Sequence, residues 1–299
     1  MKTLRALITA LLFSSTGMAS GLDDSLHKAW REYQFQEWTQ AETLFKQVIS
    51  THGPSSPAGF DARCGLAMIK QFNTRKPDPA GAREDYSELL QTNPEGERYI
   101  LLTSLYAECA WQTGQTDQAD KAWQSLFDNH PASILTQEAL LQRTLLHMRG
   151  SNDKETANAI AFLKKTMSSI PQSNKAGLIP VFHGLIGDHH LQTGNPKEAR
   201  QSYMQALEGS SPESMSYSIY AGRLFQVARI SEKDLDDKET AARFYRRLVN
   251  ETPNDGRFFF SLEKSATYGS ITADEVRALK RQGLTEKVID ELFKKDPAP

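Results

Sequence analysis

Three histidines in one short stretch raise the question of a metal or catalytic site. His183, His189 and His190 flank Asp188, and imidazole nitrogens together with a carboxylate are common zinc ligands. On a helix, however, His183 and His190 lie seven residues apart on one stripe, as residues that pack against a neighbouring helix do. A metal site needs further ligands that converge, and the remaining histidines are scattered singly. We therefore interpret His183 and His190 as packing residues between helices and predict no metal ligand.

No other motif in the chain indicates catalysis. The phosphate-binding loop G-x-x-x-x-G-K-[ST], the zinc motif H-E-x-x-H and the nucleophile motif G-x-S-x-G are all missing from the sequence. The carboxylate pairs Asp23–Asp24 and Asp236–Asp237 are adjacent in sequence, so on a helix their side chains point apart. We predict no catalytic residue and no cofactor-binding residue.

The composition is that of a folded protein without a strong charge bias. The 299 residues include 35 Lys and Arg against 37 Asp and Glu, a formal charge of −2. Because no strongly basic face or long run of one sign stands out, nucleic acid is not an expected partner. Hydrophobic residues make up 39% of the chain, which excludes a disordered composition.

The N-terminus has the order of a secretory signal peptide. Lys2 and Arg5 precede the apolar run Ala6–Phe13, and small residues lead to a cleavage position after Ala19. The run is too short to span a bilayer, which takes about 20 apolar residues, and no cysteine stands at the cleavage position for lipid attachment. We predict a signal peptide over residues 1–19 and a periplasmic or secreted mature protein, with no membrane insertion after cleavage.

Cys64 and Cys109 are the only cysteines in the sequence. An exported protein can form a disulfide, but both residues lie in apolar stretches with helical character, and a bridge needs Cα atoms within about 7 Å. We favour buried free thiols and leave a disulfide open as the alternative.

A pattern of three residues recurs along most of the chain. An alanine is followed four residues later by a large residue and twelve or thirteen residues later by a proline. The alanines and their large partners are Ala41 with Phe45, Ala82 with Tyr86, Ala119 with Trp123, Ala159 with Leu163, Ala199 with Tyr203, and Ala241 with Tyr245. Successive alanines are 37 to 42 residues apart, and self-similarity at such a period is typical of a solenoid.

This pattern resembles the second half of the tetratricopeptide repeat, A-x3-F…P, in a family whose repeats are pairs of antiparallel helices. The first half of that repeat reads W-x2-L-G-x2-Y. Its places are held by His183, Ile186, Gly187 and His190 in the fifth unit, and by Thr103, Tyr106, Ala107 and Ala110 in the third. Small residues such as Ala107 and Gly187 let two helices approach closely, and the proline ends the second helix.

The resemblance implies an all-α fold, a right-handed superhelical solenoid of helix–turn–helix repeats with a C-terminal helical hairpin. We predict about six repeats over residues 22–255, followed by a capping helix and the hairpin over residues 256–299. The intervals between alanines exceed the 34 residues of the family, so turns or helices are expected to be longer than usual.

The C-terminal region carries its own helix signals. Phe258 to Phe260 are expected to shield the last repeat, because the end of a solenoid needs covering. An exposed aromatic partner site at these residues is the alternative. Thr272 with Glu275 forms a capping box, and Thr285 is a second N-cap. Gly283 is expected to end the first helix of the hairpin. The hairpin is either a terminal cap or a small docking module, and its predicted shared face consists of Val276, Leu279, Ile289, Leu292 and Phe293.

Members of this family generally bind peptides or proteins in a concave groove lined by the first helices of their repeats. Positions spaced i, i+4, i+7 on those helices predict the partner-binding residues Trp30, Tyr33, Glu108, Trp111, Asp188, Leu191 and Arg229. Aromatic side chains beside isolated charges suit peptide recognition. In the alternative interpretation, Trp30 and Trp111 are partly buried against neighbouring helices. The carboxylates of Glu108 and Asp188 would repel the C-terminal carboxylates that some members of the family bind.

These observations predict a non-enzymatic protein–protein interaction scaffold of the cell envelope, with a peptide or protein partner in the groove. The alternative is an envelope enzyme or a carbohydrate-binding protein that uses Trp30, Tyr33 and Trp111 as a stacking surface. Exposed flat aromatic faces would favour sugar, whereas aromatics in pockets beside charges would favour peptide.

Overall fold

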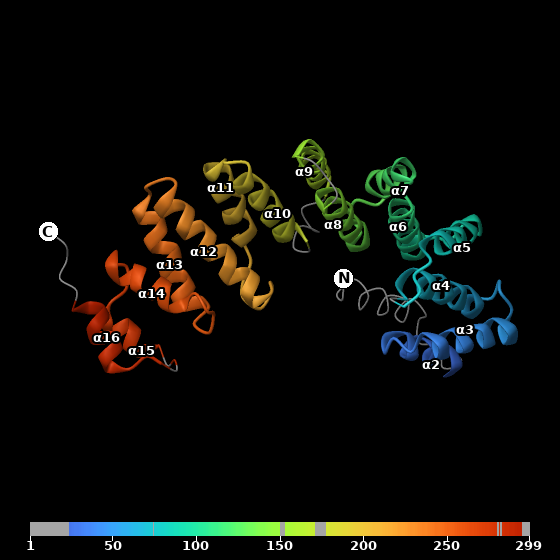
Figure 1. The fold of residues 1–299 in the computed structure, drawn as a ribbon, viewed down its shortest axis with the longest axis horizontal. Coiled ribbons are helices and arrows are strands. Elements are labelled where there is room, and N and C mark those ends of the chain that lie inside the picture. Colours follow the sequence, from blue (N-terminus) through green and yellow to red (C-terminus); the bar gives the residue numbers. More distant parts are fainter. Residues whose placement is uncertain are drawn as a thin grey trace. The chain divides into compact units, whose positions relative to one another are not determined.

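The computed structural model describes residues 24–73, 75–149, 153–170, 178–279, 281 and 283–294. The predicted signal peptide and its cleavage position lie outside the described residues, and so does Pro171, the proline of the fourth repeat. Every regular element within the described residues is a helix (Figure 1). This confirms the predicted all-α class.

The helices belong to two compact units, which are described separately. The N-terminal unit contains α2 (Asp24–Gln34), α3 (Trp38–His52), α4 (Pro57–Phe72), α5 (Pro79–Gln91), α6 (Gly96–Gln112), α7 (Thr116–Asn129) and α8 (Ile134–Arg149). The C-terminal unit contains α9 (Asp153–Ser168), α10 (Ile179–Gln192), α11 (Pro196–Leu207), α12 (Tyr217–Lys233), α13 (Lys238–Glu251), α14 (Phe258–Thr267), α15 (Ala273–Ala278) and α16 (Glu286–Phe293).

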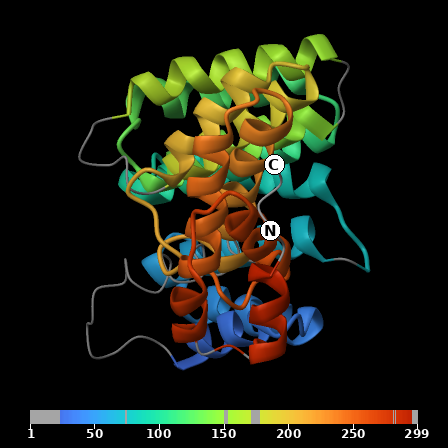
Figure 2. The same cartoon turned by 90° about the vertical axis from the view of Figure 1, so that its left-hand side faces the viewer.

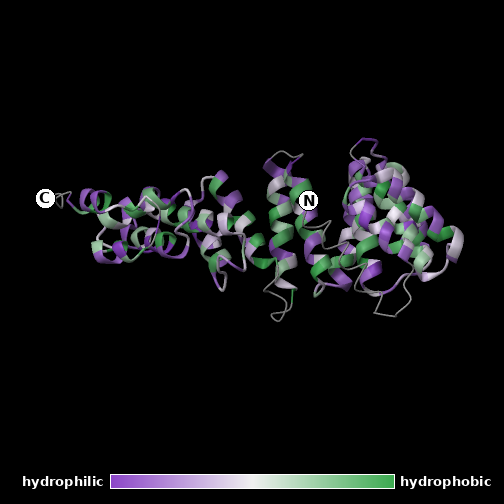
Figure 3. Cartoon of the chain, turned by 90° about the horizontal axis from the view of Figure 1, so that it is seen from below, coloured by the Kyte–Doolittle hydropathy of each residue, from purple (hydrophilic) through white to green (hydrophobic). Residues whose placement is uncertain are grey.

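Successive helices within each unit pack against one another. In the N-terminal unit every helix from α2 to α7 packs on the next, and in the C-terminal unit the same holds from α10 to α14 (Figure 1 and Figure 2). Hydrophobic and hydrophilic residues mix along the helices (Figure 3), so that each helix has one side for its neighbours and one for solvent. This neighbour-to-neighbour packing is what a solenoid of helical pairs requires.

Serine, aspartate and proline mark the starts of several helices. Ser56 precedes Pro57 at the start of α4, and Asp78 precedes Pro79 at the start of α5. Each of the two side chains accepts a hydrogen bond from the backbone N–H three residues on, at 3.0 and 2.9 Å. These caps satisfy donors that have no partner inside the helix, and proline loses nothing at the first helical position.

The recurring alanines and large residues form the core of the repeats. All twelve are at most 2% exposed. Gly187 on α10 shows why a small residue is needed opposite them. A Cβ atom at that position would lie 2.6 Å from the ring of Tyr203 on α11. The predicted close approach of the two helices is therefore confirmed in the fifth pair.

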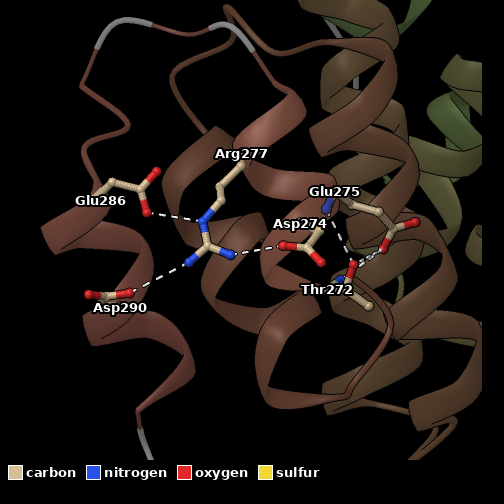
Figure 4. A network of polar contacts seen from close by, with 6 residues as sticks. All are labelled: Thr272, Asp274, Glu275, Arg277, Glu286 and Asp290. Atoms are coloured by element: carbon tan, nitrogen blue, oxygen red, sulfur yellow. Dashed lines mark hydrogen bonds and ion pairs between the residues drawn. The ribbon is translucent and has the colours of Figure 1, made fainter.

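The C-terminal hairpin has the predicted caps. Thr272 and Glu275 form a capping box at the start of α15, and the Thr285 side chain accepts a hydrogen bond from the third residue of α16. Arg277 joins the two helices, with ion pairs of 2.9 Å to Asp274 and 3.0 Å to Glu286 (Figure 4). The predicted shared face of the hairpin packs in one apolar cluster with Phe258 and Leu262 of α14.

One expectation for this region is wrong. α15 ends at Ala278, so Gly283 does not end it but lies in the turn before α16 with φ +91°. The expected shielding of the last repeat is seen for two of the three phenylalanines. Phe258 is buried in one apolar cluster with Val249 of α13, and the Phe260 ring packs against Tyr245. Phe259 and Phe260 are each 43% exposed.

Cys64 and Cys109 are free thiols, and both are buried. Burial raises the pKa of each thiol far above its ordinary value, and a thiol that stays protonated is a poor nucleophile. None of the described helices is both long and apolar enough to cross a membrane.

Candidate functional site

The predicted partner-binding aromatics of the first helix pair lie in the core. Trp30 is 2% exposed and Tyr33 is 3% exposed. The Trp30 ring packs edge-on against Phe45 of α3 at a centroid distance of 4.9 Å, and the Tyr33 ring packs against Trp38 at 5.4 Å. Their assignment to an open groove is therefore corrected. These rings hold α2 on α3 and present no surface to a partner.

Trp111 is half-buried against its neighbours in the third pair. Its ring centroid lies 4.3 Å from that of His147 on α8 and 6.2 Å from that of Trp123 on α7. Glu108, one turn earlier on α6, is 6% exposed and accepts a hydrogen bond from Gln142 at 3.2 Å. For Trp111 the packing alternative describes the structure better than an open groove, and the Glu108 carboxylate belongs to the same packed interface.

A polar acceptor on the first helix faces the recurring aromatic of the second helix in several pairs. The Tyr86 hydroxyl donates to Gln71 at 2.9 Å, and the Tyr203 hydroxyl donates to Asp188 at 2.7 Å. In the sixth pair, Glu232 accepts a hydrogen bond from the Tyr245 hydroxyl at 2.8 Å. These polar groups therefore satisfy tyrosine hydroxyls inside the repeats.

Asp188 has a second structural role between pairs. Arg223 of α12 donates two hydrogen bonds to its carboxylate, at 2.6 and 3.0 Å, and lies 4.9 Å over the ring of Tyr203. Gly184 makes room for this guanidinium, since a Cβ there would lie 2.8 Å from it. Asp188 therefore links the fifth and sixth pairs rather than offering a free charge to a ligand.

Glu232 also joins two helices of the C-terminal unit. It accepts a hydrogen bond from Tyr268 at 2.6 Å and pairs with Lys264 of α14. Burial opposes its ionisation, but the hydrogen bonds from Lys264, Tyr268 and Tyr245 lower the pKa of Glu232 below its ordinary value. The carboxylate is thus charged at neutral pH and fully engaged.

The histidines of α10 are half-buried and lie near a lysine. His190 Nε2 is 2.9 Å from Lys164 Nζ on α9, and the rings of His189 and His190 are 5.9 Å apart. Burial and the Lys164 charge lower the pKa values of His189 and His190. No group of three potential ligands that could hold a metal ion occurs within the described part of the chain. The packing interpretation of His183 and His190 stays a prediction.

A cluster of aromatic rings near the end of the C-terminal unit keeps one ring exposed. The ring centroid of Phe260 on α14 lies 5.6 Å from that of half-buried Phe225 on α12 and 5.9 Å from that of Tyr245. Lys264 lies 5.7 Å over the Phe260 ring. Exposed Arg229 stands one helical turn beyond Phe225. We call Phe225, Arg229, Phe260 and Lys264 the Phe260 surface.

Of the seven predicted partner-binding residues, Arg229 lies on the Phe260 surface, and Leu191 stays half-buried on α10 against the same apolar cluster as Phe225. From the sequence, an exposed aromatic partner site at Phe258–Phe260 is the alternative to a cap, and Phe260 is not included among the predicted groove residues. The signal was present, because Phe260 and Lys264 have the i, i+4 spacing used to choose groove residues in the repeats. It was not applied to α14, since α14 follows the last repeat.

The comparisons agree with this architecture. Residues 105–133, which cover the second half of α6 and all of α7, match the family model for the tetratricopeptide repeat. The chain therefore contains a tetratricopeptide repeat in this region. No curated protein matches this chain.

Several solved structures resemble this chain in fold. The C-terminal part of a TPR repeat-containing protein from Cytophaga hutchinsonii is 14% identical, with 92% of this chain and 96% of that chain covered and a TM-score of 0.53. The pilF structure from Pseudomonas aeruginosa is 17% identical, with 79% and 94% covered and a TM-score of 0.49. At these identities the likeness to the Cytophaga protein shows the fold alone.

Proposed function

We propose that this protein is an exported, non-enzymatic interaction scaffold that binds a protein partner through the Phe260 surface. The fold of helical repeats supports a role in protein–protein interaction, since such folds present extended surfaces built from repeated helices. The N-terminal signal sequence is the reason to place the scaffold in the cell envelope or outside the cell. The buried acceptors on the first helices support a structural rather than a catalytic use of the polar residues there.

The Phe260 surface carries the proposal, because it differs from the packed aromatics elsewhere. Phe260 is 43% exposed, and its aromatic neighbours hold the ring in place, so little conformational entropy is lost on binding. Arg229 is exposed beside it and makes no hydrogen bond or ion pair within the described part of the chain. An apolar partner side chain next to a carboxylate would suit this combination.

The carbohydrate alternative required Trp30, Tyr33 and Trp111 to form an exposed stacking surface. Trp30 and Tyr33 are buried, and Trp111 packs on His147. We therefore do not propose sugar binding at these residues.

The test is site-specific photo-crosslinking in the native compartment, with a photoreactive phenylalanine at position 260. The matched control places the same group at Phe35, which is 70% exposed in the N-terminal unit. The proposal is supported if position 260 crosslinks to a discrete partner and position 35 does not. The crosslink from position 260 should also become weaker in the Arg229→Ala variant. Equal crosslinking from both positions, or none from position 260, overturns it. Intact-mass analysis of the fractionated protein tests export, with Ser20 expected at or near the mature N-terminus.

A further inference from the structure

A second surface lies between α11 and α13, which are the second helices of the fifth and sixth pairs. Both helices pack on α12, and between them a cavity of about 670 Å³ is open to solvent. Buried Leu207 and Phe244 form its floor, and Met204, 36% exposed, projects from α11. The cavity therefore combines an apolar base with an accessible, flexible side chain that adapts to different apolar partners.

Positive charge dominates the walls of this cavity. Lys197, Arg200, Arg243 and Arg247 line it together with a single acid, Glu208. We call these walls and their floor the basic groove. Along α11 it extends from Lys197 to Glu208, a rise of about 16 Å, which an extended peptide covers in about five residues.

Two of the four cations are already paired and two are not. Arg200 binds Asp237 at 2.6 Å, and Arg247 binds Glu251 at 2.7 Å. Lys197 and Arg243 have no carboxylate partner within the described part of the chain. Arg243 is held over the Phe244 ring at 5.3 Å, which orients its guanidinium at the edge of the groove.

The corresponding groove of the N-terminal unit shows that such a bias is not general. The cavity between α3 and α5 has about 470 Å³ and is lined by four cations and four acids. Most of them pair with one another. Lys46 binds Glu42 at 2.6 Å, Lys70 binds Asp85 at 2.6 Å, and Arg63 binds Glu88 at 3.3 Å. That groove pairs most of its charges internally, whereas in the basic groove Lys197 and Arg243 keep no carboxylate partner within the described residues.

We propose that the basic groove binds an acidic peptide segment that also carries an apolar side chain. Carboxylates of the peptide would pair with Lys197 and Arg243, the two cations without an internal partner, and the apolar side chain would cover Met204. Charge-assisted hydrogen bonds of this kind give specificity and fast association. The site lies on second helices and does not depend on the Phe260 surface.

The experiment measures binding of a labelled peptide to the full-length mature protein by fluorescence anisotropy. The probe is a peptide of alternating glutamate and serine with one central leucine. Lys197→Glu combined with Arg243→Glu should weaken its binding by about tenfold or more, because attraction becomes repulsion. Raising the salt concentration should weaken binding to the unaltered protein as well, since these charges are exposed.

Two controls separate the basic groove from other effects. Lys46→Glu combined with Lys76→Glu makes the same charge change in the α3–α5 groove and should change binding by less than about twofold. Phe260→Ala should also leave probe binding unchanged, so that failure here and failure of the proposed function are distinguishable. If the double glutamate variant melts early, Lys197→Gln with Arg243→Gln replaces it and should give an intermediate loss.

Several outcomes overturn the proposal. Equal losses from the two charge reversals would mean that the probe senses only overall charge. Equal binding of a peptide with serine in place of leucine would remove the role of Met204. Tighter binding of a single-stranded oligonucleotide than of the acidic peptide would indicate a nucleic-acid site. Self-association that Lys197→Glu with Arg243→Glu abolishes would assign the basic groove to a second copy of this chain.

Discussion

The first helix pair and the last one both carry aromatic residues on their first helices, yet they use them differently. In the first pair, α3 begins with Trp38 only a few residues after α2 ends, and Trp38 covers Tyr33. In the sixth pair, the ring of Phe225 instead meets Phe260 of the following helix, and Phe260 remains 43% exposed. In both cases the aromatic residue lies on the stripe chosen for groove residues. The residue that packs over it decides whether it becomes core or surface.

The largest expected effect tests the buried half of this comparison. Trp30→Ala removes a ring that is 2% exposed and packs on Phe45, so it should lower the free energy of unfolding by about 3–5 kcal/mol. Chemical denaturation followed by circular dichroism measures this. Phe35→Ala, at a 70% exposed position, should change stability by about 0.5 kcal/mol or less. If Trp30→Ala were equally harmless, Trp30 would not be part of the core.

The two units also differ in how deeply they bury an aspartate that pairs with an arginine. In the N-terminal unit Asp61 is 1% exposed beside Arg98, whereas in the C-terminal unit Asp188 keeps 37% of its side chain exposed beside Arg223. Burial raises the pKa of Asp61 to about 6, although Arg98 opposes the shift. Since the pKa in the folded state is higher than in the unfolded state, this group favours folding below about pH 4, and that contribution is lost as the pH rises through about 6.

Asp61→Asn removes this titration. The stability of the variant relative to the parent should rise by about 3 kcal/mol between pH 4 and pH 8, in line with a shift of roughly two pKa units. Denaturation curves at several pH values measure the difference. Asp24→Asn, which replaces an exposed carboxylate, controls for the loss of one negative charge. A difference that does not vary with pH would show that Asp61 is already ionised at pH 4.

A smaller effect tests whether the helices of the C-terminal unit are tightly packed inside. Gly187→Ala places a methyl group 2.6 Å from the Tyr203 ring, so overpacking should cost about 1–3 kcal/mol of stability. Gly222→Ala is the matched control, because a Cβ there meets no atom closer than 3.7 Å. Equal melting temperatures for the two variants would contradict tight packing between α10 and α11.

The smallest expected effect on stability belongs to the exposed half of the comparison. Phe260→Ala should lower the free energy of unfolding by less than about 1 kcal/mol, while it weakens binding of the crosslinked partner by about 1–2 kcal/mol. A thermal melt and a binding titration on the same preparation separate the two quantities. A large stability loss with unchanged binding per folded molecule would place Phe260 in the core.

Much of the fold could be predicted because repeats bury the same positions each time. The pairs Ala199–Tyr203 and Ala241–Tyr245 are fully buried, as their recurrence indicated. The capping residues Thr272 and Thr285 act within a few residues of sequence, so their roles are also readable without the structure. Local rules failed at Gly283, because α15 stops earlier than a glycine signal alone implies.

The candidate site was much less predictable. Trp30 and Phe260 are both aromatic residues at helical positions, and Glu108 and Asp188 are both acids on first helices. Neither residue type nor spacing says that Trp30 lies against Phe45, or that Asp188 receives Arg223 and Tyr203. Those contacts join residues that are 15 to 35 positions apart in the chain.

By itself, the sequence determined the helical repeats, the close contact at Gly187 and the caps of the hairpin, because each depends on local periodicity or on a few neighbouring residues. The tertiary structure alone decided which aromatics and charges are free to meet a partner. The exposed fraction of a side chain depends on which neighbouring helices pack over it. Two aromatic residues at similar helical positions can therefore differ in exposure. For that reason Phe260, Lys197 and Arg243 are available at the surface, while Trp30, Tyr33 and Glu108 are buried in the packed repeats.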